Sequence, residues 1–211
     1  MPPSILPYLD RKDFAGLRQL LALHPELANE EIPAGPVPAH PLHRICDRVF
    51  EGRFTDEEAL AAARILLEHG ARVDGNHPAA GRDTPLIAAA SLHADLAALL
   101  YVESGADLRH PGTHGGTALH WAAWCGRPAV VERLLAAGAE PGRRCADFGA
   151  EPLFWAVHGY VQGGRQHLAA CQTVVRMLRA AGADPQVPSR SGTRAQDLLG
   201  EEDAELSALL N

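Results

Sequence analysis

The stretch TALHWAAWCG, residues 117–126, decides the fold of this chain because related copies of it recur along the sequence. The segment TPLIAAAS begins at Thr84, 33 residues earlier, and EPLFWAVH begins at Glu151, 34 residues later. HPLHRICD begins at His40, and a weaker copy, TRAQDLLG, begins at Thr193. A fixed period of about 33 residues indicates a repeat protein, in which each repeat is one small unit that stacks on its neighbours.

Each of the first four copies is followed by an apolar stretch that ends at a Gly-Ala pair. These glycines are Gly70, Gly105, Gly138 and Gly182. A glycine placed directly after an apolar helical pattern is the usual cap of a helix C-terminus. Each unit is therefore predicted to be a short helix, a tight turn, a longer helix with a Gly cap, and a polar loop.

This unit resembles the ankyrin repeat. The resemblance lies in residues 84–86 (TPL) and 117–120 (TALH), in the alanine pairs that follow each, and in the Gly-Ala-Asp endings at Gly105 and Gly182. It implies an all-α solenoid of about six helix–turn–helix units with hairpin-like loop fingers. We expect one domain, residues 1–211, whose approximate repeats are a degenerate N-terminal unit at 1–36, then 37–80, 81–113, 114–147, 148–189 and a closing unit at 190–211.

Two units exceed the period. The unit that begins at His40 has about 11 extra residues, and the unit that begins at Glu151 has about nine. We place the extra residues in loops between the paired helices, near Phe50 and Gln162. Thr55 and Glu58 form a capping-box pattern, which predicts that the second helix of the longer early unit starts there.

The composition indicates an ordinary globular protein. The 211 residues carry a net charge of −7 and are 46% hydrophobic, which gives no basic surface for nucleic acid. No apolar run approaches the length of a membrane span, and no secretory signal is visible. We therefore expect a cytoplasmic protein. Lys12 is the only lysine among 19 basic residues, a bias that favours a GC-rich, bacterial genome.

The two tryptophans of the opening stretch fall on one side of its helix. At 100° per residue, the small residues Leu119, Ala122 and Ala123 share a face that suits packing between repeats. Trp121 and Trp124 lie on the opposite side, which the resemblance identifies as the concave surface. Two interpretations stay open: the rings stabilise their repeat by packing on its loops, or they present a contact surface for a partner.

The same positions in neighbouring units extend this surface. A binding surface is favoured by the gathering of Trp and Arg, which dominate interaction hot spots. The predicted concave residues are Arg44, Asp47, Trp121, Trp124, Trp155, His158 and Tyr160. Loop fingers should border the same groove, and their candidate residues are Arg82, Asp83, His114 and Phe148.

No reaction chemistry stands out in the sequence. The four cysteines have no C-x-x-C spacing, and His110, His114 and His120 have no carboxylate or thiol at ligand spacing, so we expect no metal site. We also expect no cofactor and no catalytic residue. Since ankyrin repeats mostly serve as adaptors or inhibitors, the resemblance implies recognition of a partner protein or peptide by a monomer. Two alternatives are a small-molecule site or unusual enzyme that uses His158 as acid or base, and a self-associating stack.

Overall fold

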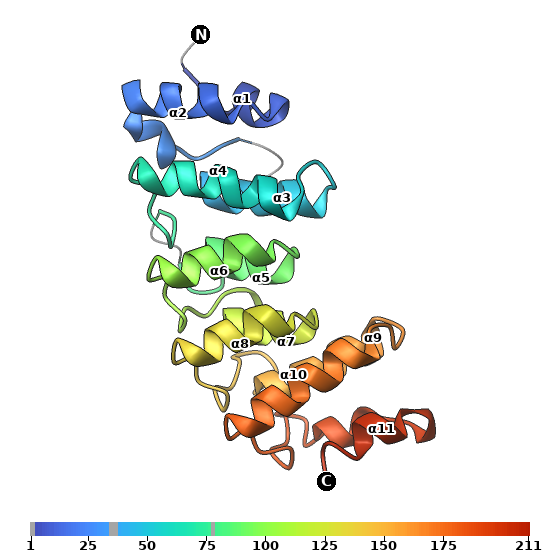
Figure 1. Ribbon diagram of the computed structural model, residues 1–211. Helices are drawn as coiled ribbons and strands as arrows, with labels where there is room; N and C mark the ends of the chain where they lie inside the picture. Colours follow the sequence, from blue (N-terminus) through green and yellow to red (C-terminus); the bar gives the residue numbers. More distant parts are fainter. Residues whose placement is uncertain (1–2, 34–37, 77–78) are drawn as a thin grey trace. The chain divides into compact units, whose positions relative to one another are not determined.

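The computed structural model describes residues 3–33, 38–76 and 79–211 of the chain. Within them the regular structure is helical, apart from an isolated antiparallel bridge between Ile32 and Ala39. The chain divides into two compact units. Their helices are labelled in Figure 1. The first comprises residues 1–79 and 84–106, and the second comprises residues 80–83 and 107–211.

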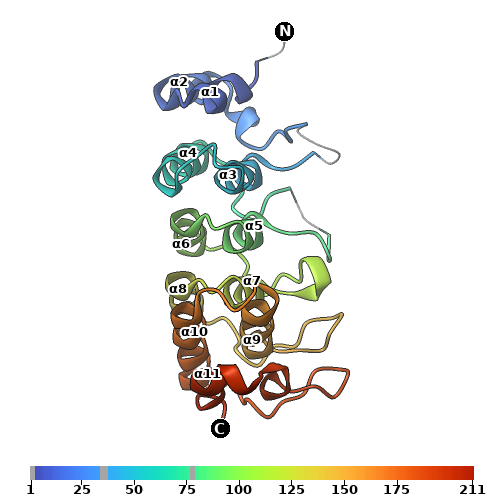
Figure 2. The same ribbon diagram turned by 90° about the vertical axis from the view of Figure 1, so that its right-hand side faces the viewer.

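The first unit consists of successive helix pairs. Its helices are α1 (Leu6–Arg11), α2 (Phe14–Leu23), the 3-10 helix η1 (Pro25–Ala28), α3 (Pro41–Phe50), α4 (Asp56–Glu68), α5 (Pro85–Ser91) and α6 (Asp95–Glu103). α3 packs on α5. In a second layer, α4 packs on α2 on one side and on α6 on the other (Figure 2).

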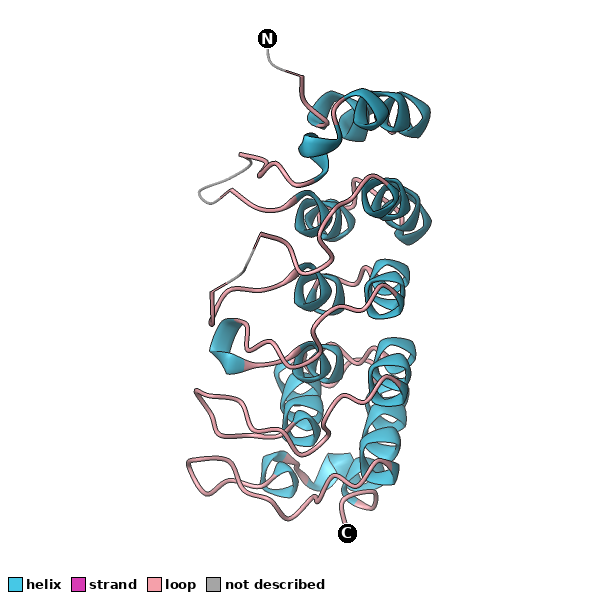
Figure 3. Cartoon of the chain, turned by 90° about the vertical axis from the view of Figure 1, so that its left-hand side faces the viewer, coloured by secondary structure: helices cyan, strands magenta, loops and turns pink. Residues whose placement is uncertain are grey.

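The second unit continues the same pattern. Its helices are η2 (Thr113–Gly115), α7 (Ala118–Trp124), α8 (Pro128–Ala136), α9 (Pro152–Gln162), α10 (Leu168–Ala180), η3 (Ala195–Leu198), η4 (Glu201–Asp203) and α11 (Ala204–Ser207). α7 packs on α9, α8 packs on α10, and η3 closes the far side of α9. The inter-repeat loops extend from the α7 and α9 side of this unit (Figures 2 and 3).

The helix ends follow the sequence signals. The side chain of Thr84 accepts a hydrogen bond from the Ile87 N–H, and Pro85 follows at the first helical position, where its missing N–H costs nothing. Gly105, Gly138 and Gly182 lie just beyond α6, α8 and α10 with φ of 83°, 93° and 98°, the left-handed conformation that glycine tolerates. The expected all-α helix–turn–helix architecture is therefore confirmed.

The small-residue face of α7 is buried as expected. Leu119, Ala122 and Ala123 are almost completely covered, and α7 packs closely on both α8 and α9. The capping box of Thr55 and Glu58 also forms, at the start of α4.

The placement of the extra residues in loops was wrong. α3 has 10 residues and α9 has 11, against seven for α5 and α7. α4 and α10 have 13 residues each, against nine for α6 and α8. Most of the added chain thus lengthens the helices, because helical continuation satisfies backbone groups that a longer loop would leave to solvent.

The repeat boundaries stay a prediction, and so does the single domain. The expected boundary at residues 36 and 37 lies outside the described residues. The division at residues 80–83 lies close to the expected boundary at residue 80, yet it assigns that finger tip to the second compact unit.

The contact between α7 and α9 depends on a glycine. A Cβ placed on Gly159 would lie 2.2 Å from the carbonyl oxygen of Trp124, far inside contact distance. The obstacle is backbone at the end of α7, which cannot move aside as the tip of a side chain can. Gly159 therefore allows the lengthened α9 to pass the end of α7.

We predict that Gly159→Ala destabilises the protein. The added methyl must push α9 from α7, and overpacking of this kind costs about 1–3 kcal/mol, more than the gain in helix propensity of up to about 1 kcal/mol. Urea unfolding followed by far-UV circular dichroism measures the change. Gly142→Ala is the matched control, because a Cβ there meets only a Glu151 carboxylate oxygen, at 3.9 Å. Equal stability of the two variants would contradict the prediction.

Candidate functional site

Three tryptophans from α7 and α9 meet in the second unit. The ring of Trp155 lies 5.1 Å from that of Trp121 and 5.8 Å from that of Trp124, measured between ring centroids. Both contacts are edge-to-face, with interplanar angles of 78° and 71°, an arrangement that aromatic quadrupoles favour. Neighbouring repeats thus join their rings into one cluster.

The cluster encloses a small apolar cavity of about 160 Å³, which we call the tryptophan pocket. Five of its seven lining residues are Trp or Phe and the other two are His: His114, Trp121, Trp124, Phe148, Phe154, Trp155 and His158. Trp121 and Trp124 are half-buried, whereas Trp155 is only 3% exposed. Trp155 is therefore the covered floor of the pocket, and Trp121 and Trp124 are the rings that a partner could reach.

Gly116 lets the floor and one wall approach each other. A Cβ on Gly116 would lie 3.0 Å from the Trp155 ring and 3.4 Å from the indole nitrogen of Trp121. That nitrogen is buried and donates no hydrogen bond to any described residue. A buried N–H without an acceptor lowers the stability of the folded state, and this one lies in the wall of the pocket.

His158 packs against two aromatic rings of the pocket. Its ring lies 5.0 Å from that of Trp124 and 5.6 Å from that of Phe154. Burial lowers the pKa of His158, so the neutral imidazole is favoured near neutral pH. Among the described residues no carboxylate forms a hydrogen bond or an ion pair with it, so the usual orienting partner of a catalytic histidine does not lie beside it.

Two loop fingers form the outer wall. His114 Nδ1 lies 2.9 Å from the Asp147 carboxylate, and the Asp147 N–H donates to the His114 carbonyl at 3.2 Å. The neighbouring Phe148 is 46% exposed, and its ring lies 5.3 Å from that of His114 and 6.2 Å from that of Trp155. The linked fingers thus hold a large apolar ring at the mouth of the pocket.

Tyr160 lies away from this pocket. Its hydroxyl donates to the buried Asp203 carboxylate at 3.2 Å, and Arg165 pairs with the same carboxylate at 3.1 Å. Its ring is almost completely covered, at 8% exposure. Tyr160 anchors the closing helices instead of forming the polar rim that the sequence predicts.

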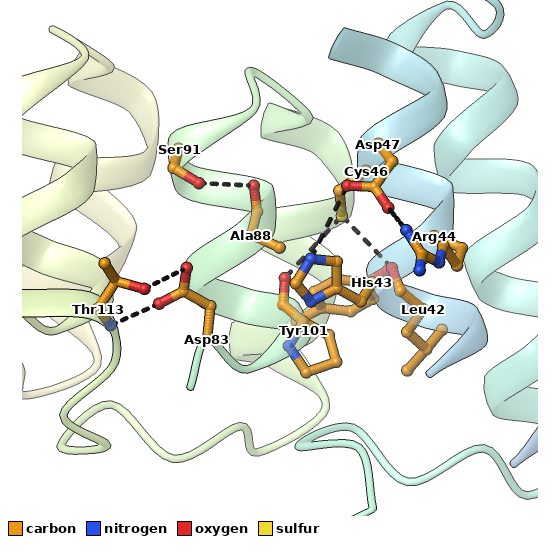
Figure 4. A network of polar contacts seen from close by, with 11 residues as sticks. Leu42, His43, Arg44, Cys46, Asp47, Asp83, Ala88, Ser91, Tyr101 and Thr113 are labelled. Atoms are coloured by element: carbon orange, nitrogen blue, oxygen red, sulfur yellow. Dashed lines mark hydrogen bonds and ion pairs between the residues drawn. The ribbon is translucent and has the colours of Figure 1, made fainter. Parts of the chain in front are cut away.

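The charged candidates also have partners of their own (Figure 4). In the first unit, Arg44 donates to Asp47 at 2.8 Å, so these two form a local ion pair. In the second, the Asp83 carboxylate accepts from the backbone N–H and the hydroxyl of Thr113, at 2.8 and 3.2 Å. Arg82 is exposed at the same finger tip. None of these four lines the tryptophan pocket.

Sequence reasoning missed Phe154, which lines the pocket, and also Asp147 and Arg190, which line a hollow next to it. Phe154 precedes Trp155 and lies one turn before His158 on α9, so helical spacing could have found it. Asp147 and Arg190 lie in fingers, where no periodic signal applies.

His110 contacts the carbonyl of Arg82, and the described residues hold no group of three or more potential metal ligands. None of the helices in the described ranges is both long and apolar enough to cross a bilayer.

Comparisons with known proteins match part of the chain. Residues 55–145 match the family model of ankyrin repeats, in three copies. Palmitoyltransferase Hip14 from Drosophila melanogaster is 38% identical over 91 residues, which cover 43% of this chain and 13% of that protein. Putative palmitoyltransferase ZDHHC13 from Danio rerio is 35% identical over 97 residues, or 46% of this chain and 14% of that protein.

The similarity concerns a short segment of each relative. Because the chain spans only about one seventh of their length, the transferase activity in their names is not shown for this chain. Both relatives come from animals, so the bacterial source favoured by the composition gains no support from them.

His120 holds the floor of the pocket in place. Its Nδ1 lies 2.9 Å from the Thr117 hydroxyl and accepts from the Thr117 N–H, and its Nε2 lies 3.2 Å from the Ala150 carbonyl. Its ring meets that of Trp155 edge-on at 5.3 Å. Burial lowers the pKa of His120 to about 4, from an ordinary value of 6.5.

We predict that this histidine makes stability fall in mild acid. Between pH 6.5 and about 4 the unfolded chain takes up a proton at His120 that the folded protein does not. The free energy of unfolding should therefore drop by on the order of 2–3 kcal/mol as the pH falls through that window.

Urea unfolding at intervals from pH 7.5 to 4 measures this slope. His120→Gln should flatten it while it lowers stability at pH 7. His40, whose pKa burial likewise lowers to about 4, supplies a similar slope in the first unit and stays unchanged as a reference. An identical slope in the protein and the variant would contradict the assignment.

Proposed function

We propose that this protein recognises a partner protein or peptide through the tryptophan pocket. Residues 55–145 match the ankyrin-repeat family, whose members generally mediate protein–protein interaction. One observation carries the proposal: two half-buried tryptophans stand around a cavity whose floor is a third, buried tryptophan. Rigid aromatic rings around a desolvated hollow are typical of interaction hot spots.

The size of the cavity favours a single inserted side chain. About 160 Å³ is smaller than the 300–1,000 Å³ typical of small-molecule sites, and it suits one large apolar group. The seven residues that line this volume include no Lys, Arg, Asp or Glu. The occupant we propose is therefore an apolar anchor on a peptide segment, held by the aromatic walls.

The contact set we propose is narrower than the sequence predicts. Trp121, Trp124, His158, His114 and Phe148 stay in it, and Phe154 joins them as a pocket wall. Trp155 acts from below as the floor. Tyr160 leaves the set because its hydroxyl and ring are engaged elsewhere.

The alternative of a small-molecule site or enzyme built on His158 has less support. Its histidine packs against two aromatic rings and has no orienting carboxylate bonded to it among the described residues, and ankyrin repeats are typically non-catalytic. A role as adaptor or inhibitor fits the proposed pocket equally, because both need only a specific contact.

A reducing compartment such as the cytoplasm suits the same proposal. The four cysteines, all among the described residues, form no disulfide. We propose that the protein acts there as a monomer, since the aromatic residues it would use for contact belong to one unit. Light scattering after size exclusion tests this, and a dimer would overturn it.

We predict that peptides selected on the intact protein from a random displayed library bind through the pocket. Trp124→Ala should weaken their binding by about 30-fold or more, because truncating a hot-spot aromatic costs about 2 kcal/mol or more. Trp124→Phe should retain part of the affinity. Fluorescence polarisation with synthetic peptides measures the dissociation constants.

Phe50→Ala is the matched control, since Phe50 is an exposed aromatic residue of the first unit. Circular dichroism and the urea midpoint establish that each variant is folded. Peptides that bind Trp124→Ala as tightly as the unsubstituted protein would place recognition elsewhere and overturn the proposal.

A further inference from the structure

A second hollow adjoins the tryptophan pocket. It measures about 470 Å³ and shares Phe148, Phe154 and His158 with that pocket. Five of its six other lining residues are polar, and most come from the last finger: Asp147, Ser189, Arg190, Ser191 and Thr193. The sixth is Leu198. A segment whose side chain fills the pocket therefore continues directly into polar surroundings.

Arg190 brings a positive charge to this hollow, and its guanidinium forms no ion pair with a carboxylate of the described residues. The backbone N–H of Arg190 donates to the Phe148 carbonyl at 2.7 Å. Its guanidinium donates to the carbonyls of Asp147 and Ala146, at 2.9 and 2.6 Å. These carbonyl bonds fix the guanidinium in position. They use two of its five N–H donors, which leaves a preorganised cation beside the hollow.

The neighbouring groups add further donors. Ser189, Ser191 and Thr193 form a chain of hydroxyls with oxygen–oxygen distances of 2.9 and 3.0 Å. The nearby Asp147 carboxylate lies 2.9 Å from His114 Nδ1, so it is directed toward the other finger. Hydroxyl hydrogens beside a fixed guanidinium are suited to an anionic group.

Resting on the function proposed above, we propose that the partner is an acidic peptide segment. Its large apolar side chain fills the tryptophan pocket, and an Asp or Glu carboxylate within about three residues of that side chain pairs with Arg190. Aromatic rings can also hold a cation, but a cationic ligand here would be repelled by the Arg190 guanidinium in the adjoining hollow. The charge at the pocket edge therefore selects an acidic neighbour over a basic one.

The same library selection tests this inference. We expect the enriched peptides to combine one bulky apolar residue with Asp or Glu within about three positions. Replacing that Glu by Gln in a synthetic peptide should weaken binding by about tenfold or more, since it removes a charge-assisted hydrogen bond. Raising NaCl from 50 to 500 mM should weaken the Glu peptide more than the Gln peptide.

Arg190→Gln should weaken the Glu peptide and leave the Gln peptide nearly unchanged. Because Arg190 also joins two fingers, this comparison of two peptides on one variant separates lost charge from altered structure. Arg176→Gln is the control: it removes an equal charge from α10, in the layer away from the fingers (Figure 2), and should change neither affinity.

The outcomes separate this inference from the proposed function. Peptides that need Trp124 but carry Lys or Arg, or no charge, beside the anchor would overturn the acidic partner and keep the pocket. Equal binding of the Glu and Gln peptides would do the same. Peptides that bind independently of Trp124, or a library from which nothing enriches, would overturn both.

Discussion

The close contact between α7 and α9 is the constraint on which the candidate site depends. Gly159 removes the one side chain that would separate the helices, and the Trp155 ring then meets both tryptophans of α7 edge-on. His120 fixes that ring from beneath through hydrogen bonds at both imidazole nitrogens. Packing, a neutral buried histidine and a missing Cβ thus act together to hold three indoles around one small volume.

Local rules were sufficient to predict most of the fold. Thr84 with Pro85 and the Gly-Ala pairs are short-range signals, and their helices begin and end where those signals stand. The added residues near Phe50 and Gln162 show the limit of counting a period. The same number of extra residues can form either a longer loop or further helical turns, so the count alone does not distinguish them. The choice depends on which backbone groups find hydrogen-bond partners.

The candidate site could be predicted only on the helix that displays it. The helical wheel placed Trp121 and Trp124 away from the small-residue seam, and both line the pocket. It placed Trp155 on an equivalent position but could not show that the next finger and Phe148 cover that ring. Tyr160 was misplaced for a similar reason, because Asp203, its partner 43 residues later, lies in the short 3-10 helix η4, which is too short to show a periodic pattern.

Charge acts on this surface at two ranges. The net charge of −7 repels an acidic segment at a distance, but salt screens that repulsion over roughly 8–10 Å. Arg190 acts at contact, where its carbonyl partners already hold it in place and little side-chain entropy is left to lose. An acidic partner would then associate slowly and be retained by short-range contacts, so its selectivity would lie in its dissociation rate. The aromatic walls contribute to the same rate, since they gain from an anchor only after it has displaced water from the pocket.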